Sequence, residues 1–427
     1  MREQTNGTSK KATVLITILT AAAVLGSTTF GIRLPVFMLS PVRIMLLITV
    51  VASFFMGAKL VFAHEVSSIY KFWGCLFLYA CLSGFWVVDN QKWMTGLSYL
   101  LTGILIFFVF LCFDEILSFF KVFQVVIALF LILIIIWGWY EVTTGNYMFV
   151  QKKEVIYLLS FEKNRVPIFV FLNTNNYALF VSFALILLFS MMTGHSIIKK
   201  LIYIGLIVSS FPLLIISNSR ANVIGLAIGI AVWIFAGMTS KLTMRKVVIA
   251  VLLALAVLIF VIVFWSSINN ALSEFFYFSG KKADSSKSNI SRSNATKNGI
   301  EMVFNSFGLG VGCGNSSAPV YSVYNTMGNY DQHNWWLLVF CEYGIIFGVA
   351  YIIIYILQIR KLLRFLRNET DSEYRKVFSA FAAIDTAFIV CLVSPSGIVA
   401  MEWLWVYWGF RYAWVNKYCL TQLENTE

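Results

Sequence analysis

VFQVVIALFLILIIIWGW, residues 122–139, contains no charged residue and is close to the length that a helix needs to cross a bilayer core, about 20 residues. A second such run, VVIAVLLALAVLIFVIVFW, occupies residues 247–265. Of the 427 residues, 59% are hydrophobic and 12% are charged, whereas soluble domains carry about 25% charged residues. The sequence therefore predicts an all-α, polytopic membrane protein and excludes a soluble domain.

Apolar runs separated by polar breaks predict about 12 transmembrane helices. Their approximate centres are residues 21, 47, 78, 105, 130, 180, 207, 229, 257, 346, 385 and 406. Basic residues gather in short loops such as KLTMRK (241–246) and KLLRFLR (361–367). Because cytoplasmic loops carry an excess of Lys and Arg, both termini are predicted to be cytoplasmic. The same assignment places Arg411 on the cytoplasmic side.

Two polar segments on the outer face are long enough to hold structure. They divide the chain into a membrane domain over residues 1–268, a large extracytoplasmic loop over 269–333 and a second membrane domain over 334–427. The first domain holds about nine spans and an outside loop near 140–166, and the last domain holds about three spans. The large loop, between the ninth and tenth spans, contains a short amphipathic helix and a glycine-rich turn. Irregular polar segments over a rigid scaffold usually carry function, so we expect the chemistry on the outer face.

Composition argues against several classes of partner and cofactor. The net charge of +12 reflects membrane topology rather than a nucleic-acid partner. The seven cysteines form no CxxC pair, which supports neither a disulfide framework nor a zinc site. GLGVGCGN (308–315) fits neither GxGxxG nor a sequence ending in GK[ST], so a tight turn is favoured over a nucleotide cradle, although its amides could form an anion nest. We predict no cofactor and no metal.

His333 is the one histidine predicted on the outer face, where the large loop enters the tenth span in YDQHNWWLLVFCEYG (330–344). An imidazole with its unperturbed pKa near 6.5 is suited to act as a general base at neutral pH. The alternative is an interfacial histidine in an aromatic belt with Trp335 and Trp336. Asp331 or Asn334 is expected to orient the ring.

Four arginines are predicted on the same face: Arg43, Arg165, Arg220 and Arg292. Arginine suits bidentate recognition of phosphate in a substrate. The alternative role of these arginines is contact with lipid headgroups. Arg220 lies in a short connector, SNSRAN, and Arg292 precedes the amphipathic helix. Several cations on one face, beside the only outside histidine, favour a phosphate-bearing substrate.

Glu342, Asp385 and Glu402 lie within predicted spans. Acids inside a membrane are costly and suggest an ion-coupled transporter, unless they are protonated or paired with an arginine or a helix end. The sequence shows no inverted repeat of the kind that many transporters contain. FGIRLP, the first predicted outside loop, has no carboxylate, which argues against a metal-dependent lipid-phosphate glycosyltransferase.

Four segments between residues 164 and 348 carry motifs in a fixed order: NRVPIFVFLNTNNYALF (164–180), ISNSRANVIGLAIG (216–229), SRSNATKNGIEMVFNSFGLGVGCGN (291–315) and HNWWLLVFCEYGIIFG (333–348). Together they resemble motifs of the O-antigen ligase and Wzy-type polysaccharide polymerase superfamily. NTNN departs from the family pattern, in which Pro often follows the first Asn. The remaining spans resemble the family only as generic apolar helices.

The resemblance implies metal-independent glycosyl transfer from a polyprenyl-diphosphate-linked oligosaccharide at the outer face of a bacterial inner membrane. It implies His333 as general base, Arg220 and Arg292 on the diphosphate, and weaker roles for Arg165 and Arg43. Asn176, Asp331 and Asn334 would be supporting residues. The implied partners are the lipid-linked donor, an acceptor, membrane lipids, a flippase and a chain-length regulator. A polymerase is favoured over a ligase to lipid A-core, and a lipid-linked oligosaccharide transporter and an assembly scaffold remain the alternatives of another class.

Overall fold

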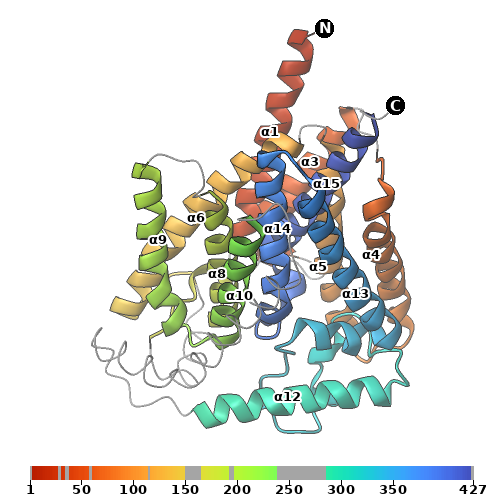
Figure 1. Cartoon of the computed structure of the whole chain (residues 1–427). Coiled ribbons are helices and arrows are strands. Elements are labelled where there is room, and N and C mark those ends of the chain that lie inside the picture. Colours follow the sequence, from red (N-terminus) through yellow and green to blue (C-terminus); the bar gives the residue numbers. More distant parts are fainter. Residues whose placement is uncertain are drawn as a thin grey trace.

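The described part of the chain is a helical bundle. A computed structural model of the protein describes residues 2–26, 30–33, 38–56, 60–113, 116–149, 165–191, 197–237 and 285–424. Within these ranges nearly all regular structure is helical (Figure 1), which confirms the all-α class. The predicted ninth span around residue 257, His195 and residues 269–284 of the predicted large loop lie outside the described residues.

The helices, with the labels of Figure 1, are α1 (Arg2–Leu25), α3 (Pro41–Phe55), α4 (His64–Leu82), α5 (Asn90–Val109), α6 (Ile116–Thr144), α8 (Thr174–Met191), α9 (Ile197–Ile216), α10 (Arg220–Gly237), α12 (Ser285–Asn305), α13 (Trp335–Asn368), α14 (Ser372–Cys391) and α15 (Glu402–Glu424). Short 3-10 turns are η1 (Ser83–Phe85), η2 (Phe110–Cys112), η3 (Phe169–Phe171), η4 (Asn315–Ser317), η5 (Pro319–Tyr321) and η6 (Ile398–Ala400). Two short strands, β1 (Ile32–Arg33) and β2 (Met38–Leu39), pair antiparallel.

Several of these helices have the length and composition of membrane spans. Four are long and apolar enough to cross a bilayer: His64–Phe85, Asn90–Cys112, Ile116–Thr144 and Trp335–Asn368. Shorter apolar helices lie in α1, α3, α8, α9 and α10. The protein is thus a multi-pass membrane protein. Every predicted span centre in the described part of the chain lies within a helix, while the total of 12 spans and the position of the large loop remain predictions.

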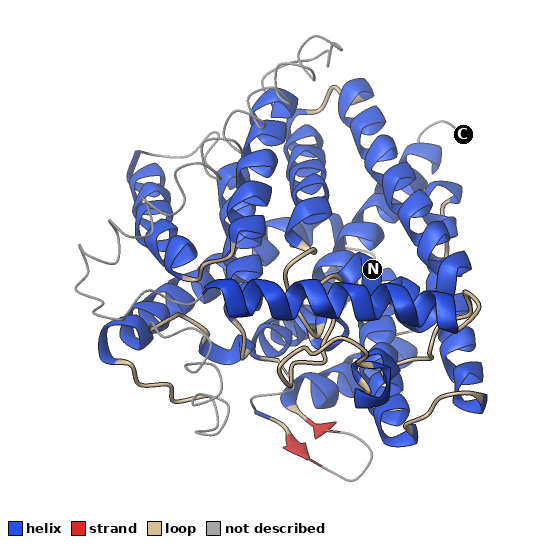
Figure 2. Cartoon of the chain, turned by 90° about the horizontal axis from the view of Figure 1, so that it is seen from below, coloured by secondary structure: helices blue, strands red, loops and turns tan. Residues whose placement is uncertain are grey.

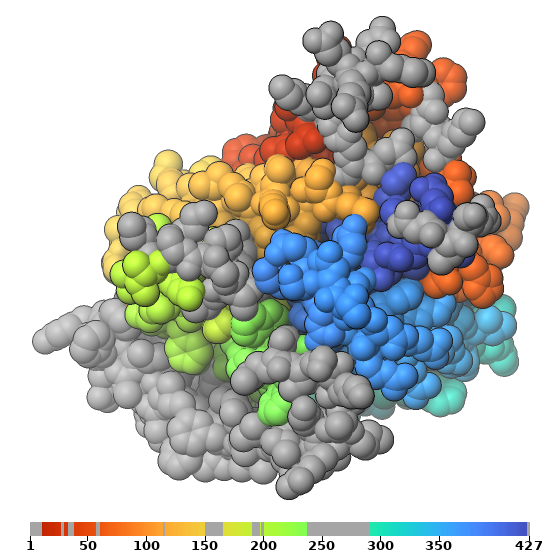
Figure 3. All heavy atoms as spheres, turned by 45° about the horizontal axis from the view of Figure 1, so that its top comes forward, coloured from red at the N-terminus to blue at the C-terminus, as the bar shows by residue number. Residues whose placement is uncertain are grey.

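The two ends of the bundle differ. Both termini lie at one end, and α12 runs across the opposite end (Figure 1). Seen from that opposite end, α12 crosses in front of the bundle and the loops that follow it lie alongside (Figure 2). At the end with the termini, the connection between α13 and α14 lies near the middle of the surface, close to α6 and the C-terminal part of α15 (Figure 3).

α15 is the central helix, because its side chains are buried on every face from Glu402 to Asn416. A helix that is buried all round must approach its neighbours closely, and small residues permit this. A Cβ at Gly409 would lie 2.9 Å from Phe107 Cα in α5, and a Cβ at Gly103 would lie 2.3 Å from Trp405. Aromatic rings fill the space around this contact, as in the pair Trp73 and Trp405, 4.8 Å apart.

α13 contains a sharp kink at Gly344, whose φ of 81° and ψ of −179° are open essentially only to glycine. The kink frees backbone groups, and the glycine-rich segment pairs with them: Val311 N donates to Cys341 O at 2.7 Å, and Ile345 N donates to Gly308 O at 2.9 Å. A Cβ at Gly310 would lie 2.6 Å from Gly344 N. This segment is a tight turn packed against α13, in agreement with the interpretation favoured from the sequence.

Candidate active site

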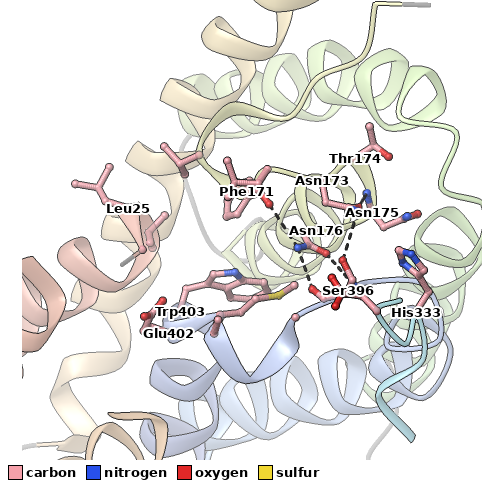
Figure 4. Close-up of a pocket in the computed structure, with 18 of the residues that line it drawn as sticks. Leu25, Phe171, Asn173, Thr174, Asn175, Asn176, His333, Ser396, Glu402 and Trp403 are labelled. Carbon is pink, nitrogen blue, oxygen red and sulfur yellow. Dashed lines mark hydrogen bonds between the residues drawn. The ribbon is translucent and has the colours of Figure 1, made fainter. Parts of the chain in front are cut away.

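A cavity of about 510 Å³ opens at the end of the bundle that carries α12. Four segments far apart in the sequence form its walls: the end of α1, η3 with the start of α8, α12 with the loop before α13, and the connection from α14 to α15. Figure 4 shows the asparagines of α8, Ser396 and His333 on one side, with Glu402 and Trp403 on the other. The cavity combines an apolar wall with a small number of polar groups, which is typical of ligand sites.

His333 is held at the cavity edge by the start of α13. Asn334 is the N-cap of this helix and accepts hydrogen bonds from Trp336 N and Leu337 N, so the chain turns sharply directly after His333. Trp335 N donates to Leu392 O at 2.9 Å, which ties this turn to the end of α14. The order H-N-W-W therefore fixes the imidazole at the seam between the loop and the helix.

Burial changes the acid–base properties of His333. Burial, together with the positive charge of Arg292, lowers its pKa to about 4, and the backbone of Ser394 partly opposes this lowering. Its Nε2 lies 2.7 Å from Asn329 Nδ2. Its Nδ1 is buried. The ring is therefore neutral at pH 7 and carries a lone pair that can accept a proton.

Asn329 contacts the His333 ring, and the sequence did not predict this contact. The imidazole has its hydrogen bond with Asn329, whereas Asn334 caps α13 and no bond joins Asp331 to the ring among the described residues. Asn329 follows a tight turn in which Met327 and Gly328 both have positive φ, and Asn329 N donates to Thr326 O. The feature of the sequence that could have predicted it is Met-Gly-Asn (327–329), a turn-forming stretch shortly before His333.

Arg292 reaches the cavity from α12, the helix that crosses the end of the bundle. α12 covers 21 residues and is longer than the short helix expected. Side chains along it hold the following loop: Ser291 Oγ donates to Thr326 O at 2.9 Å, and Asn298 bonds both the N and the O of Tyr324. These contacts hold Arg292 and the loop that carries His333 in one assembly.

A buried polar network supports the wall formed by α8. Asn175 Oδ1 accepts from Ser219 Oγ at 2.8 Å, and Asn222 Nδ2 donates to Asn175 O and to Ser394 Oγ. Asn176 accepts from Ser396 N and donates to Ser396 O, so it clamps the α14–α15 connection. The Asn-rich start of α8 thus acts by joining three segments rather than by a charge of its own.

The η3 wall is strained. Phe169 and Leu172 have positive φ of 45° and 58°, a conformation that is costly for bulky residues. Glu141 of α6 stabilises it, because its carboxylate accepts hydrogen bonds from Ile168 N and Phe169 N. Backbone strain of this kind gathers at ligand sites, which singles out this wall of the cavity.

The structure does not gather all four predicted arginines at the cavity. Arg292 lines it, whereas Arg220 is exposed at the first turn of α10, next to Ser219 of the buried network. Arg165 is exposed and bonds Thr143 O at the end of α6. Arg43 bonds Met38 O and Ser98 Oγ and lies over the Tyr99 ring. Of the supporting residues, Asp331 and Asn176 line the cavity and Asn334 does not.

The acids within the predicted spans have separate environments. Asp385 Oδ2 lies 2.9 Å from Arg411 Nη2, with both side chains almost fully buried. Glu342 Oε1 accepts from Ser316 Oγ at 2.7 Å, beside the glycine-rich turn, and Glu402 lines the cavity at the start of α15. The pairing alternative for Asp385 is confirmed. α15 carries the Arg411 guanidinium inside the bundle, and the side of the membrane assigned to Arg411 stays a prediction.

Within the described ranges, no group of three or more His, Cys, Asp and Glu side chains is arranged to hold a metal ion. The groups that face the cavity are instead a neutral imidazole, a guanidinium, amides and carboxyls. This donor set fits proton transfer and anion binding.

The fold and this cavity define a class: a multi-pass membrane protein with a polar site at one end of the bundle. Residues 204–353 match the family model described as O-Antigen ligase. Over 365 residues, the chain is 28% identical to the teichuronic acid biosynthesis protein TuaE of Bacillus subtilis (strain 168), an alignment that covers 82% of this chain and 72% of that protein. These matches support the O-antigen ligase and polymerase superfamily and a function in polysaccharide biosynthesis.

Proposed function

We propose that the protein is a glycosyltransferase that polymerises polyprenyl-diphosphate-linked oligosaccharide units on the outer face of a bacterial inner membrane. The observation that carries this proposal is the shared cavity of His333 and Arg292. The O-antigen ligase match contains both residues, and the name of the Bacillus relative refers to teichuronic acid biosynthesis. The proposed substrates are a lipid-linked donor and an acceptor, and the proposed partners are a flippase and a chain-length regulator.

His333 is the proposed general base. A sugar hydroxyl is a poor nucleophile, so removal of its proton as it attacks lowers the barrier. The neutral ring, held by Asn329 Nδ2 at Nε2, presents its lone pair at that nitrogen. An incoming hydroxyl would take the place of the neutral Asn329 amide. The new bond joins the hydroxyl oxygen to the anomeric carbon, and the proton passes to His333.

Arg292 is the proposed cation on the leaving group. The bond from the anomeric carbon to the diphosphate oxygen breaks, and the diphosphate leaves with the electron pair. A fixed guanidinium stabilises the charge that develops there. Arg220, one residue beyond the network that supports the cavity wall, is the second proposed diphosphate ligand, with Arg165 and Arg43 as weaker candidates. The apolar side of the cavity, formed by Leu25, Phe171 and Trp403, suits the start of a prenyl chain.

Purified protein incubated with a defined polyprenyl-diphosphate oligosaccharide tests this function. We expect longer glycans on the lipid and release of polyprenyl diphosphate, with the same yield in the presence of a chelator. Transfer to lipid A-core without lengthening would support the ligase instead. Absence of transfer, together with movement of the lipid-linked sugar across vesicle membranes, would support the transporter.

A further inference from the structure

A second cavity, of about 480 Å³, adjoins the first. Asp331, Gly397 and Ala400 line both cavities and so form their common border. Most of the remaining wall of the second cavity comes from the first turns of α5 and from the glycine-rich segment near η4, with further residues from the start of α13. None of these residues entered the site predicted from the sequence except Asp331.

The charged groups around this cavity disfavour an anionic ligand. Three carboxyl groups, Asp89, Asp331 and Glu342, face one cation, Lys92. Lys92 Nζ is already engaged, because it donates to Ser317 O and Ser317 Oγ, both at 3.0 Å. A diphosphate would find no unengaged cation among these lining groups, whereas an uncharged ligand rich in hydroxyl groups would find hydrogen-bond partners.

One face of α5 presents further groups suited to a sugar. Gln91, Thr95 and Tyr99 are spaced four residues apart, which places them in line on the helix, and all three line the cavity. They offer an amide, a hydroxyl and an aromatic ring. Amides and hydroxyls bond sugar hydroxyl groups, and a ring packs against the apolar face of a pyranose.

We propose that the second cavity binds the saccharide of the glycosyl acceptor. The proposal rests on the proposed function, because it assigns the lipid diphosphate of the donor to the cavity of Arg292. In a direct displacement the acceptor hydroxyl approaches the anomeric carbon from the side opposite the leaving group. A site that adjoins the donor cavity at Asp331, two residues from His333, places the acceptor beside both the donor and the proposed base.

Steady-state kinetics with two separate substrates test the assignment. The donor is a polyprenyl-diphosphate oligosaccharide whose acceptor hydroxyl is blocked, and the acceptor is a soluble glycoside of the repeat unit. Thr95→Trp is designed to fill the second cavity. It is expected to raise the KM for the acceptor about tenfold, which corresponds to about 1.4 kcal/mol of lost binding free energy. The KM for the donor should stay within about twofold of wild type. The matched control is Met94→Trp, at the adjacent exposed position of α5 that lines neither cavity, and it is expected to leave both KM values unchanged.

Several outcomes overturn the inference. A rise in the donor KM alone, or no change in either KM, excludes acceptor binding in this cavity. If Thr95→Trp does not fold, Gln91→Ala removes atoms without adding bulk and must still raise the acceptor KM. If the wild-type protein transfers nothing, the proposed function fails. Direct binding of the glycoside then tests whether the second cavity binds a saccharide. Weaker binding to Thr95→Trp than to wild type supports a saccharide site, and equal binding to both proteins rejects it.

Discussion

Two pairs of ionisable residues occupy different regions of this bundle. In the interior, Asp385 and Arg411 are 2.9 Å apart, and Tyr407 also donates to the Asp385 carboxylate. At the end that carries α12, His333 and Arg292 line one cavity, and burial together with the charge of Arg292 keeps the imidazole neutral. The interior charges compensate each other, whereas the cavity combines a neutral imidazole with a guanidinium.

This difference separates a buried ion pair that stabilises the fold from the cavity residues that are proposed to carry out the reaction. A carboxylate within a predicted span suggested a transporter, but Asp385 is bonded to an arginine and a tyrosine and lines neither of the two cavities. A buried pair of this kind can hold helices in register, while breaking it is costly. The proposed chemistry therefore belongs to the cavity, and four predictions test or sharpen the contrast.

The largest effect is expected from His333→Gln. Removal of the proposed base should lower the rate of transfer by about 10²- to 10⁴-fold, because proton transfer contributes that much in other enzymes. The matched control is His64→Gln, since His64 is exposed at the start of α4, next to the residue that bonds Asn416 of α15. The control should retain wild-type activity. Full activity in folded His333→Gln would exclude its role as base.

Arg292→Ala is expected to lower kcat by about 10²- to 10³-fold, the loss typical of removing one group that stabilises developing negative charge. Arg220→Ala should lower kcat by a smaller factor, because Arg220 does not line the cavity. The smallest decreases in kcat are expected for Arg165→Ala and Arg43→Ala. Initial rates at saturating donor measure this order. An effect of Arg165→Ala that exceeds that of Arg292→Ala would contradict the assigned position of the diphosphate.

Asp385→Asn is expected to destabilise the protein by about 3–5 kcal/mol, because it leaves Arg411 buried without a counter-charge. The double variant Asp385→Leu/Arg411→Met should recover most of this loss. The exposed pair of Lys376 and Glu373 is the control, and Lys376→Met should cost less than about 1 kcal/mol. Thermal unfolding in detergent compares the three. A stable, inactive Asp385→Asn would favour a functional role.

The pH profile should show a smaller but specific effect. Because burial and Arg292 lower the pKa of His333 to about 4, the ring stays neutral down to that pH. The acid limb of kcat/KM is therefore expected near pH 4, and Arg292→Gln should move it upward by removing a positive charge. An acid limb near pH 6.5, the pKa of a free histidine, would show that the imidazole is solvated or not the base.

Periodicity and motif order predicted much of the architecture. Long apolar runs without charge allow few structures other than membrane helices, so the all-α class followed from composition. His333 could be singled out because it is the one histidine predicted on the outer face, where the large loop enters a span. The same local reasoning identified the glycine-rich turn.

Contacts between particular side chains could not be predicted in this way. Asn329 reaches the imidazole through a turn, and Glu141 reaches Phe169 across 28 residues of chain. The pairing of Asp385 with Arg411 depends on how α14 and α15 pack, and hydropathy does not report this. The sequence ranked Arg220 together with Arg292 and above Arg165 and Arg43, whereas packing brings Arg292 to the cavity and leaves Arg220 outside its lining.

The central claim, that the cavity performs the chemistry and the interior pair holds the bundle, is tested most directly in one assay. Wild type, His333→Gln and Asp385→Leu/Arg411→Met are purified, checked for folding, and given the same defined polyprenyl-diphosphate oligosaccharide. We predict that the double variant lengthens the glycan at a rate near wild type per folded molecule, while His333→Gln is folded and inactive. Lengthening by His333→Gln, with none by a folded double variant, would contradict the account.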